Sequence, residues 1–154
     1  YFIEGLKISV AMAAKYQVML AVEIMDTDFL NSIQKYMKYD QLIHSPWLTV
    51  YPDIGNLSAW GNDVGYELEV GCSRIVAVHV KETLNVTDTS PGKFRDTPFG
   101  AGDVDFVTIF KQLKSLEYRG PFLNEMWADT FTDPIAEITR SKEFVLNKLK
   151  ASGF

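Results

Sequence analysis

Three carboxylates and one imidazole stand at the ends of four short apolar runs in this 154-residue chain. They are Glu23, Asp53, His79 and Glu125, and their spacings are 30, 26 and 46 positions. Mixed oxygen and nitrogen ligands suit Zn2+, Mn2+, Mg2+ or Co2+ better than a soft metal, and a set without cysteine is not a structural zinc site. The residue types therefore predict a site for one divalent metal ion.

The apolar runs before these four residues have the composition of buried parallel strands. We expect strands at residues 18–24, 48–51, 75–80 and 121–127. Parallel strands point their carboxyl ends in one direction, so residues at the four ends meet at one mouth of a barrel. These spacings are too long for a local sequence motif. The prediction therefore depends on finding a potential ligand at the end of each of four successive strands.

Amphipathic segments alternate with the strands, which is typical of βα units. Helical spacing covers residues 2–16, 29–43, 63–71, 104–116 and 134–149. Asp133 has the properties of an N-cap for the last helix, with Pro134 at its first position. We expect residues 53–56 to form the exit loop of the second strand.

Four βα units in series, each near the ~31 residues of an eightfold repeat over ~250, predict half of a (β/α)8 TIM barrel. A doubly wound sheet is the alternative, but no Gly-x-Gly-x-x-Gly or phosphate-loop motif begins any helix. We interpret residues 1–154 as one α/β domain, the C-terminal half of a barrel, with the N-terminal half absent. Four strands leave two open edges, so we expect a homodimer unless the missing strands are supplied.

A polar segment at residues 81–103 far exceeds the usual ~2 to 6 residues of a βα connection, and such long loops are often functional. Arg95 in this segment is a substrate-binding candidate, since a guanidinium can clamp hydroxyl or phosphate oxygens with its fork of donors. The alternative for Arg95 is a surface ion pair with Asp96.

Three further residues are substrate-binding candidates, each with a simpler alternative. Lys81 either faces the site or lies on its rim, Asn56 either orients substrate oxygens or holds its own turn, and Trp127 either walls the pocket or packs. TIM barrels often hold phosphate in the loops after strands seven and eight, here residues 81–103 and 127–133.

Composition and charge exclude several classes of function. The chain carries 15 Lys and Arg against 20 Asp and Glu, and a formal net charge of -5 argues against general affinity for nucleic acid. No apolar run approaches the ~20 residues that cross a bilayer, so we expect no membrane segment. A single cysteine, Cys72, cannot form an internal disulfide, which fits a reducing compartment and predicts a cytoplasmic protein.

Several segments closely resemble the L-ribulose-5-phosphate (L-xylulose-5-phosphate) 3-epimerases, some of which are labelled hexulose-6-phosphate isomerases. The resemblance lies in residues 20–26, 51–60, 79–83, 94–100 and 124–127, and it spans the chain but only the second half of the family's barrel. Two departures are Glu82, where many members carry Asp, and Ala101, where Glu is frequent.

The resemblance implies a xylose-isomerase-like TIM barrel in which Glu23, Asp53, His79 and Glu125 bind one divalent metal. It also implies that Glu23 and Glu125 exchange the C3 proton of a pentulose phosphate through an ene-diolate. A second glutamate favours an epimerase over a keto-aldose isomerase, because inversion needs acid/base groups on both faces of the carbon. Two alternatives stay open, a keto-aldose isomerase on the same metal site and an inactive fragment that needs its missing half.

Overall fold

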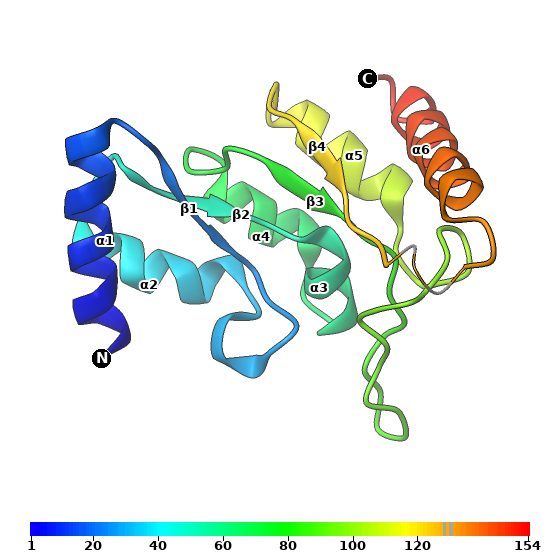
Figure 1. The fold of residues 1–154 in the computed structure, drawn as a ribbon, viewed down its shortest axis with the longest axis horizontal. Coiled ribbons are helices and arrows are strands. Elements are labelled where there is room, and N and C mark those ends of the chain that lie inside the picture. Colours follow the sequence, from blue (N-terminus) through cyan, green and yellow to red (C-terminus); the bar gives the residue numbers. More distant parts are fainter. Residues whose placement is uncertain (128, 130) are drawn as a thin grey trace.

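In the computed structural model, which describes residues 1–127, 129 and 131–154, the four strands run parallel (Figure 1). The strands are β1 (Leu20–Glu23), β2 (Leu48–Tyr51), β3 (Val78–Val80) and β4 (Phe122–Asn124). β1 pairs with β2, and β3 pairs with β4. Isolated parallel bridges, Val50 with Ile75 and Asp53 with His79, join the two pairs in the order β1-β2-β3-β4.

Helices connect successive strands, and α1 and α6 lie at opposite ends of the row of strands in Figure 1. They are α1 (Phe2–Tyr16), α2 (Ile33–Ile43), α3 (Ile54–Ala59), α4 (Val64–Gly71), α5 (Phe106–Ser115) and α6 (Pro134–Ala151), with a 3-10 turn η1 (Asp28–Leu30). This alternation of parallel strands and helices agrees with the predicted half barrel.

Side-chain caps fix the starts of several helices. Asp133 accepts a hydrogen bond from the Ala136 N–H at 3.0 Å, and Pro134 occupies the first turn of α6, as predicted. Ser32 caps α2 and Asp63 caps α4 in the same way. Each such cap is typically worth about 1 kcal/mol of helix stability.

Two local predictions were wrong. The strands predicted at 18–24, 75–80 and 121–127 are shorter than expected, and the β1 residues are half-buried because the described residues supply a neighbouring strand on only one side. Residues 53–56 are not an exit loop, because α3 begins at Ile54. The Asp53 carboxylate accepts the Gly55 and Asn56 N–H groups at 2.9 and 3.0 Å and thereby starts a helix.

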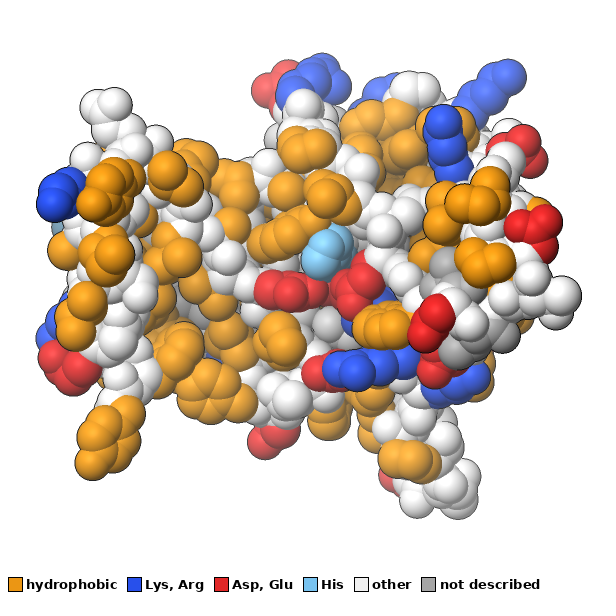
Figure 2. Space-filling model, in the orientation of Figure 1, with side chains coloured by type: hydrophobic (Ala, Val, Ile, Leu, Met, Phe, Trp, Pro, Cys, Tyr) orange, Lys and Arg blue, Asp and Glu red, His pale blue; other side chains and the backbone are white. Residues whose placement is uncertain are grey.

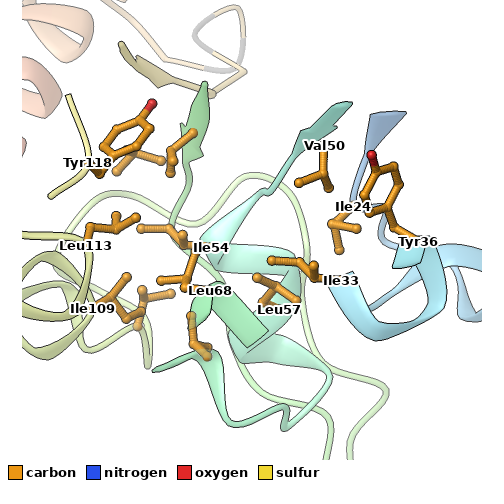
Figure 3. Packing of buried hydrophobic residues seen from close by; sticks show 14 of the residues in the cluster. Ile24, Ile33, Tyr36, Val50, Ile54, Leu57, Leu68, Ile109, Leu113 and Tyr118 are labelled. Atoms are coloured by element: carbon orange, nitrogen blue, oxygen red, sulfur yellow. The ribbon is translucent and has the colours of Figure 1, made fainter. Parts of the chain in front are cut away.

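The hydrophobic core lies between the strands and helices α2, α3, α4 and α5 (Figure 3). Its fully buried members include Ile24, Ile33, Tyr36, Val50, Ile54, Leu57, Leu68, Phe110 and Leu113. Burying a side chain of this size contributes about 1.5 to 3 kcal/mol relative to exposing it. The packed helices therefore give a firm support to the strands whose carboxyl ends carry the candidate site.

The predicted long polar loop is present between β3 and α5. Isolated antiparallel bridges, Leu84 with Lys93 and Thr87 with Ser90, fold part of it into a narrow hairpin. This hairpin projects away from the strands in Figure 1. The loop then returns along residues 94–103 toward the carboxyl ends of the strands.

Candidate metal centre

The strands bring all four predicted metal ligands into one cluster. Glu23 ends β1, Asp53 follows β2, His79 lies in β3 and Glu125 directly follows β4. One potential ligand atom from each lies within 4.8 Å of the other three. Figure 2 shows a histidine beside carboxylate side chains near the centre of this face. The cluster arises because four parallel strands end on the same side.

The His79 imidazole lies between two carboxylates. Its Nδ1 atom is 2.7 Å from Glu23 Oε1 and 3.1 Å from Glu125 Oε2. Burial lowers the pKa of His79, but the hydrogen bond and charge of Glu23, together with the charge of Glu125, outweigh burial and raise this pKa above 6.5. Without a bound cation, the carboxylates therefore favour a protonated imidazole as their counter-charge.

Asp53 is fully buried and its two oxygens have different tasks. Oδ1 caps α3, whereas Oδ2 lies 2.9 Å from the Lys81 ammonium. Burial raises the pKa of Asp53 to about 7, although the charge of Lys81 and the hydrogen bonds of the cap act in the opposite direction. The α3 cap holds one carboxylate oxygen in place and leaves the other facing the cluster.

Lys81 is itself buried beside the cluster, with 4% of its surface exposed. Its Nζ atom lies 3.4 Å from Glu125 Oε1 as well as 2.9 Å from Asp53 Oδ2. It also lies 5.6 Å from the centre of the Trp127 ring. The structure therefore places Lys81 inside the site rather than on its rim.

The donor set fits a divalent cation. Among the described residues, Asp53 Oδ2 and Glu125 Oε2 are buried and accept no hydrogen bond, although each lies near a cationic group. Buried carboxylate oxygens without hydrogen bonds retain the lone pairs that a metal ion requires. Glu23, Asp53, His79 and Glu125 are the residues that would hold such an ion.

The substrate-binding candidates lie in different places. Arg95, Lys81 and Trp127 line one small cavity together with Glu125, on one side of the cluster. Asn56 is buried elsewhere and donates from Nδ2 to the Ile24 carbonyl oxygen at 2.9 Å, while its Oδ1 accepts no hydrogen bond among the described residues. The loop predicted at 127–133 contains two residues, 128 and 130, that lie outside the described part of the chain.

Arg95 connects three loops at this cavity. Its guanidinium is 3.3 Å from Asp26 Oδ2, in the loop after β1, and 5.1 Å from the Trp127 ring centre, after β4. The Arg95 side chain remains 60% exposed, so it is accessible to an anion from solvent. The ion pair found in the structure is with Asp26 and not with the adjacent Asp96.

Sequence reasoning missed two acidic residues near this site. Asp26 was not predicted to contact Arg95, and Glu82 was noted only as a departure from a family pattern. The position of Glu82 directly after β3, where the chain enters the long loop, is a usable signal for a loop anchor. Nothing local in the sequence indicates the Asp26 contact, because the two residues are far apart along the chain.

The fold defines a class of protein, the parallel (β/α) barrels, and the candidate metal-binding residues lie at the carboxyl ends of its strands. The family model of the xylose isomerase-like TIM barrel matches residues 1–148, and the chain belongs to this family. None of the helices in the described part of the chain is long and apolar enough to cross a membrane.

Curated relatives agree with this family and carry names of one reaction. The chain is 56% identical to the protein named "Putative L-ribulose-5-phosphate 3-epimerase SgbU" of Escherichia coli strain K12, over 99% of the chain and 54% of the relative. It is 50% identical to L-ribulose-5-phosphate 3-epimerase UlaE of Escherichia coli O157:H7, over 99% of the chain and 51% of the relative. The chain thus spans about half the length of the curated relatives it matches.

Solved structures share the fold at low sequence identity. An L-ribulose 3-epimerase matches with a TM-score of 0.80 and 18% identity, over 97% of this chain and 53% of that one. The 3-keto-D-glucoside 4-epimerase YcjR of Escherichia coli matches with a TM-score of 0.76 and 17% identity, over 94% and 52% of the two chains. These likenesses confirm the predicted half of a TIM barrel.

Proposed function

We propose that the chain carries the metal-binding half of a sugar-phosphate 3-epimerase that interconverts L-ribulose 5-phosphate and L-xylulose 5-phosphate. The convergence of Glu23, Asp53, His79 and Glu125 within 4.8 Å carries this proposal. The names of relatives about half identical to the chain support the same reaction. One divalent ion, Zn2+, Mn2+, Mg2+ or Co2+, is the cofactor that this donor set suits.

Inversion at C3 requires one group to remove the proton and another to return a proton to the opposite face. Glu23 and Glu125 are the proposed pair, since they stand at the ends of β1 and β4, the first and last strands of the row, and approach His79 Nδ1 from there at 2.7 and 3.1 Å. When bound, a divalent cation supplies Lewis-acid polarisation of the substrate carbonyl, typically worth several kcal/mol. Arg95, Lys81 and Trp127 would contact the substrate from the adjoining cavity. Asn56 would instead hold the loop after β1, through its hydrogen bond to the Ile24 carbonyl oxygen.

Proton NMR in D2O tests the reaction on the full-length polypeptide in which this chain occurs. We expect the C3–H signal of L-ribulose 5-phosphate to disappear and L-xylulose 5-phosphate to form with Mn2+, and both changes to stop with a chelator. Glu125→Gln should abolish turnover, whereas the same change at exposed Glu143 on α6 should leave it unaffected. Exchange at C1 with an aldose product would replace the proposal with a keto-aldose isomerase, and an active Glu125→Gln variant would remove the role given to Glu125.

The open strand edges support a second proposal, that this half barrel pairs with further strands. Apolar side chains beside the outer strands are exposed, including Met19 at 56% and Leu123 at 44%. A second copy, in a homodimer, would cover them unless the rest of a barrel does so. Light scattering on the chain alone tests this, and a stable monodisperse monomer would contradict it. The cytoplasmic location stays a prediction.

A further inference from the structure

A buried carboxylate outside the proposed ligand set connects the two ends of the long loop. Glu82 is 2% exposed and lies in the segment after β3. Its Oε2 accepts the Gly100 N–H at 2.8 Å, and its Oε1 accepts the Thr83 and Val104 N–H groups at 3.3 Å each. One side chain at the start of the loop therefore satisfies backbone donors at its end.

The backbone is closely packed around this carboxylate. The Asp103 N–H donates to the Thr83 carbonyl oxygen at 2.9 Å, so the outgoing and returning segments touch directly. A Cβ atom at Gly102 would overlap both the Thr83 carbonyl oxygen and the Glu82 carboxylate. Only glycine at position 102 allows the returning segment to approach this closely.

The segment just before this closure forms a wall of the cavity beside the candidate metal centre. Residues 95–99 line that cavity together with Lys81, Glu125 and Trp127, and Glu82 itself lies at its edge. Phe99 also packs against Phe106 and Phe144, with ring centres 5.9 Å apart in each case. The wall is therefore held from its helix side by apolar contacts and from its strand side by Glu82.

We propose that Glu82 is a positioning residue that sets the place of residues 95–99 and thereby the affinity of the site for its sugar phosphate. This inference rests on the proposed function for its substrate. An aspartate is one methylene shorter, so from the same backbone its carboxylate would lie farther from these three N–H groups. Although Glu82 lines the cavity, its hydrogen bonds among the described residues go to backbone N–H groups of the loop and to none of the four proposed ligands, which assigns it the role of a loop anchor.

The variant Glu82→Gln tests the proposal in the natural polypeptide. Glutamine keeps one acceptor oxygen but turns an NH2 group toward backbone N–H donors, which repel it. We expect amide hydrogen exchange in residues 94–104 to accelerate by about tenfold or more. We also expect KM for L-ribulose 5-phosphate to rise by about tenfold while kcat changes less than about threefold, because uniform binding is lost. Calorimetric Mn2+ affinity should stay unchanged.

A matched control is available in Glu67→Gln. Glu67 is also buried, at 1% exposure, and accepts the backbone N–H and the side-chain amide of Gln34 at 3.0 and 2.7 Å. It joins α2 to α4, away from the loop, so this variant should leave KM and exchange in residues 94–104 unaffected. If Glu82→Gln does not fold, Glu82→Asp keeps the charge, and we expect smaller changes in the same direction.

The outcomes separate this proposal from the proposed function. Unchanged exchange in residues 94–104 would overturn the anchor whether or not the protein is an epimerase. Accelerated exchange with an unchanged KM would overturn the effect on the substrate, and a parallel loss of Mn2+ affinity would show that Glu82 acts on the metal centre itself. A wild-type protein without epimerase activity would refute the proposed function and the substrate effect, while the exchange result would still decide the anchor.

Discussion

Replacing Lys81 by methionine removes the cation that lies beside buried Asp53 and keeps an unbranched side chain only one heavy atom shorter. Asp53 is fully buried, and the Lys81 ammonium lies 2.9 Å from its Oδ2. Breaking a buried ion pair by removing one partner typically costs about 3 to 5 kcal/mol, because the remaining charge is uncompensated. At Asp53 the carboxylate can instead take up a proton, so the cost depends on pH.

The pH dependence follows from the pKa of Asp53. Burial raises this pKa to about 7 in the folded protein, against about 3.9 in an unfolded chain. The folded state therefore binds the proton more tightly, and Asp53 makes stability fall as pH rises from about 4 to 7. Lys81→Met removes the positive charge that lowers this pKa. The free energy of unfolding of the variant therefore continues to fall above pH 7, by about 1.4 kcal/mol per pH unit. At pH 8.5 the variant should be about 2 kcal/mol less stable than the wild type, and at pH 5 nearly equal to it.

Urea unfolding at pH 5 and pH 8.5, in the presence of a chelator, measures this difference. The chelator matters because a cation bound to Asp53 would replace the missing ammonium. Lys35→Met is the control, since Lys35 pairs at 3.0 Å with an Asp28 side chain that is 87% exposed. Such surface pairs contribute about 0 to 1 kcal/mol. An equal loss for Lys81→Met at both pH values would refute the electrostatic reasoning and assign the effect to lost packing.

Two further predictions concern the candidate metal centre. Neighbouring carboxylates raise the pKa of His79, burial raises that of Asp53 to about 7, and both groups must lose a proton to bind a metal ion. Mn2+ affinity measured by calorimetry should therefore rise by more than about tenfold per pH unit below pH 6.5, and a pH-independent affinity would contradict this. Gly55→Ala would place a Cβ atom 2.6 Å from the Lys81 carbonyl oxygen, so urea unfolding should show a loss of about 1 to 3 kcal/mol, with weaker Mn2+ binding as the cap at Asp53 shifts. Gly5→Ala, in open space on α1, should instead stabilise the protein by up to about 1 kcal/mol.

The sequence predicted those features that depend on repeated patterns. Apolar runs and helical spacing located all four strands and most helices, and the parallel arrangement predicted that Glu23, Asp53, His79 and Glu125 would meet. Their role as metal ligands stays a prediction. The start of α3 was missed because Asp53 serves as a cap as well as a candidate ligand, and a strand-end carboxylate signals both.

Side-chain partners were the part that the sequence could not predict. Whether Lys81 enters the site or stays on the rim depends on how deeply its partner Asp53 is buried, and burial is decided by the tertiary packing. Arg95 had an adjacent acid in Asp96, yet it pairs with Asp26, because the loop carries it across the mouth of the strands. Choices between equally plausible partners depend on the path of the loop, and residues 81–103 have little periodicity to predict that path.

The candidate ligands are divided between two small sheets. Glu23 and Asp53 belong to the β1–β2 side and His79 and Glu125 to the β3–β4 side. Within the described residues, the pairing between the two sides consists of isolated bridges. Three backbone hydrogen bonds in the described part of the chain cross this junction, those of the Val50, Val76 and His79 N–H groups, and a short ladder of this kind can open locally without unfolding of the whole protein. The four side chains thus lie on both sides of the junction between the two pairs of strands. A ligand bound by all four side chains would therefore also cross-link the β1–β2 and β3–β4 sides, so that the two sides of the domain unfold as one cooperative unit.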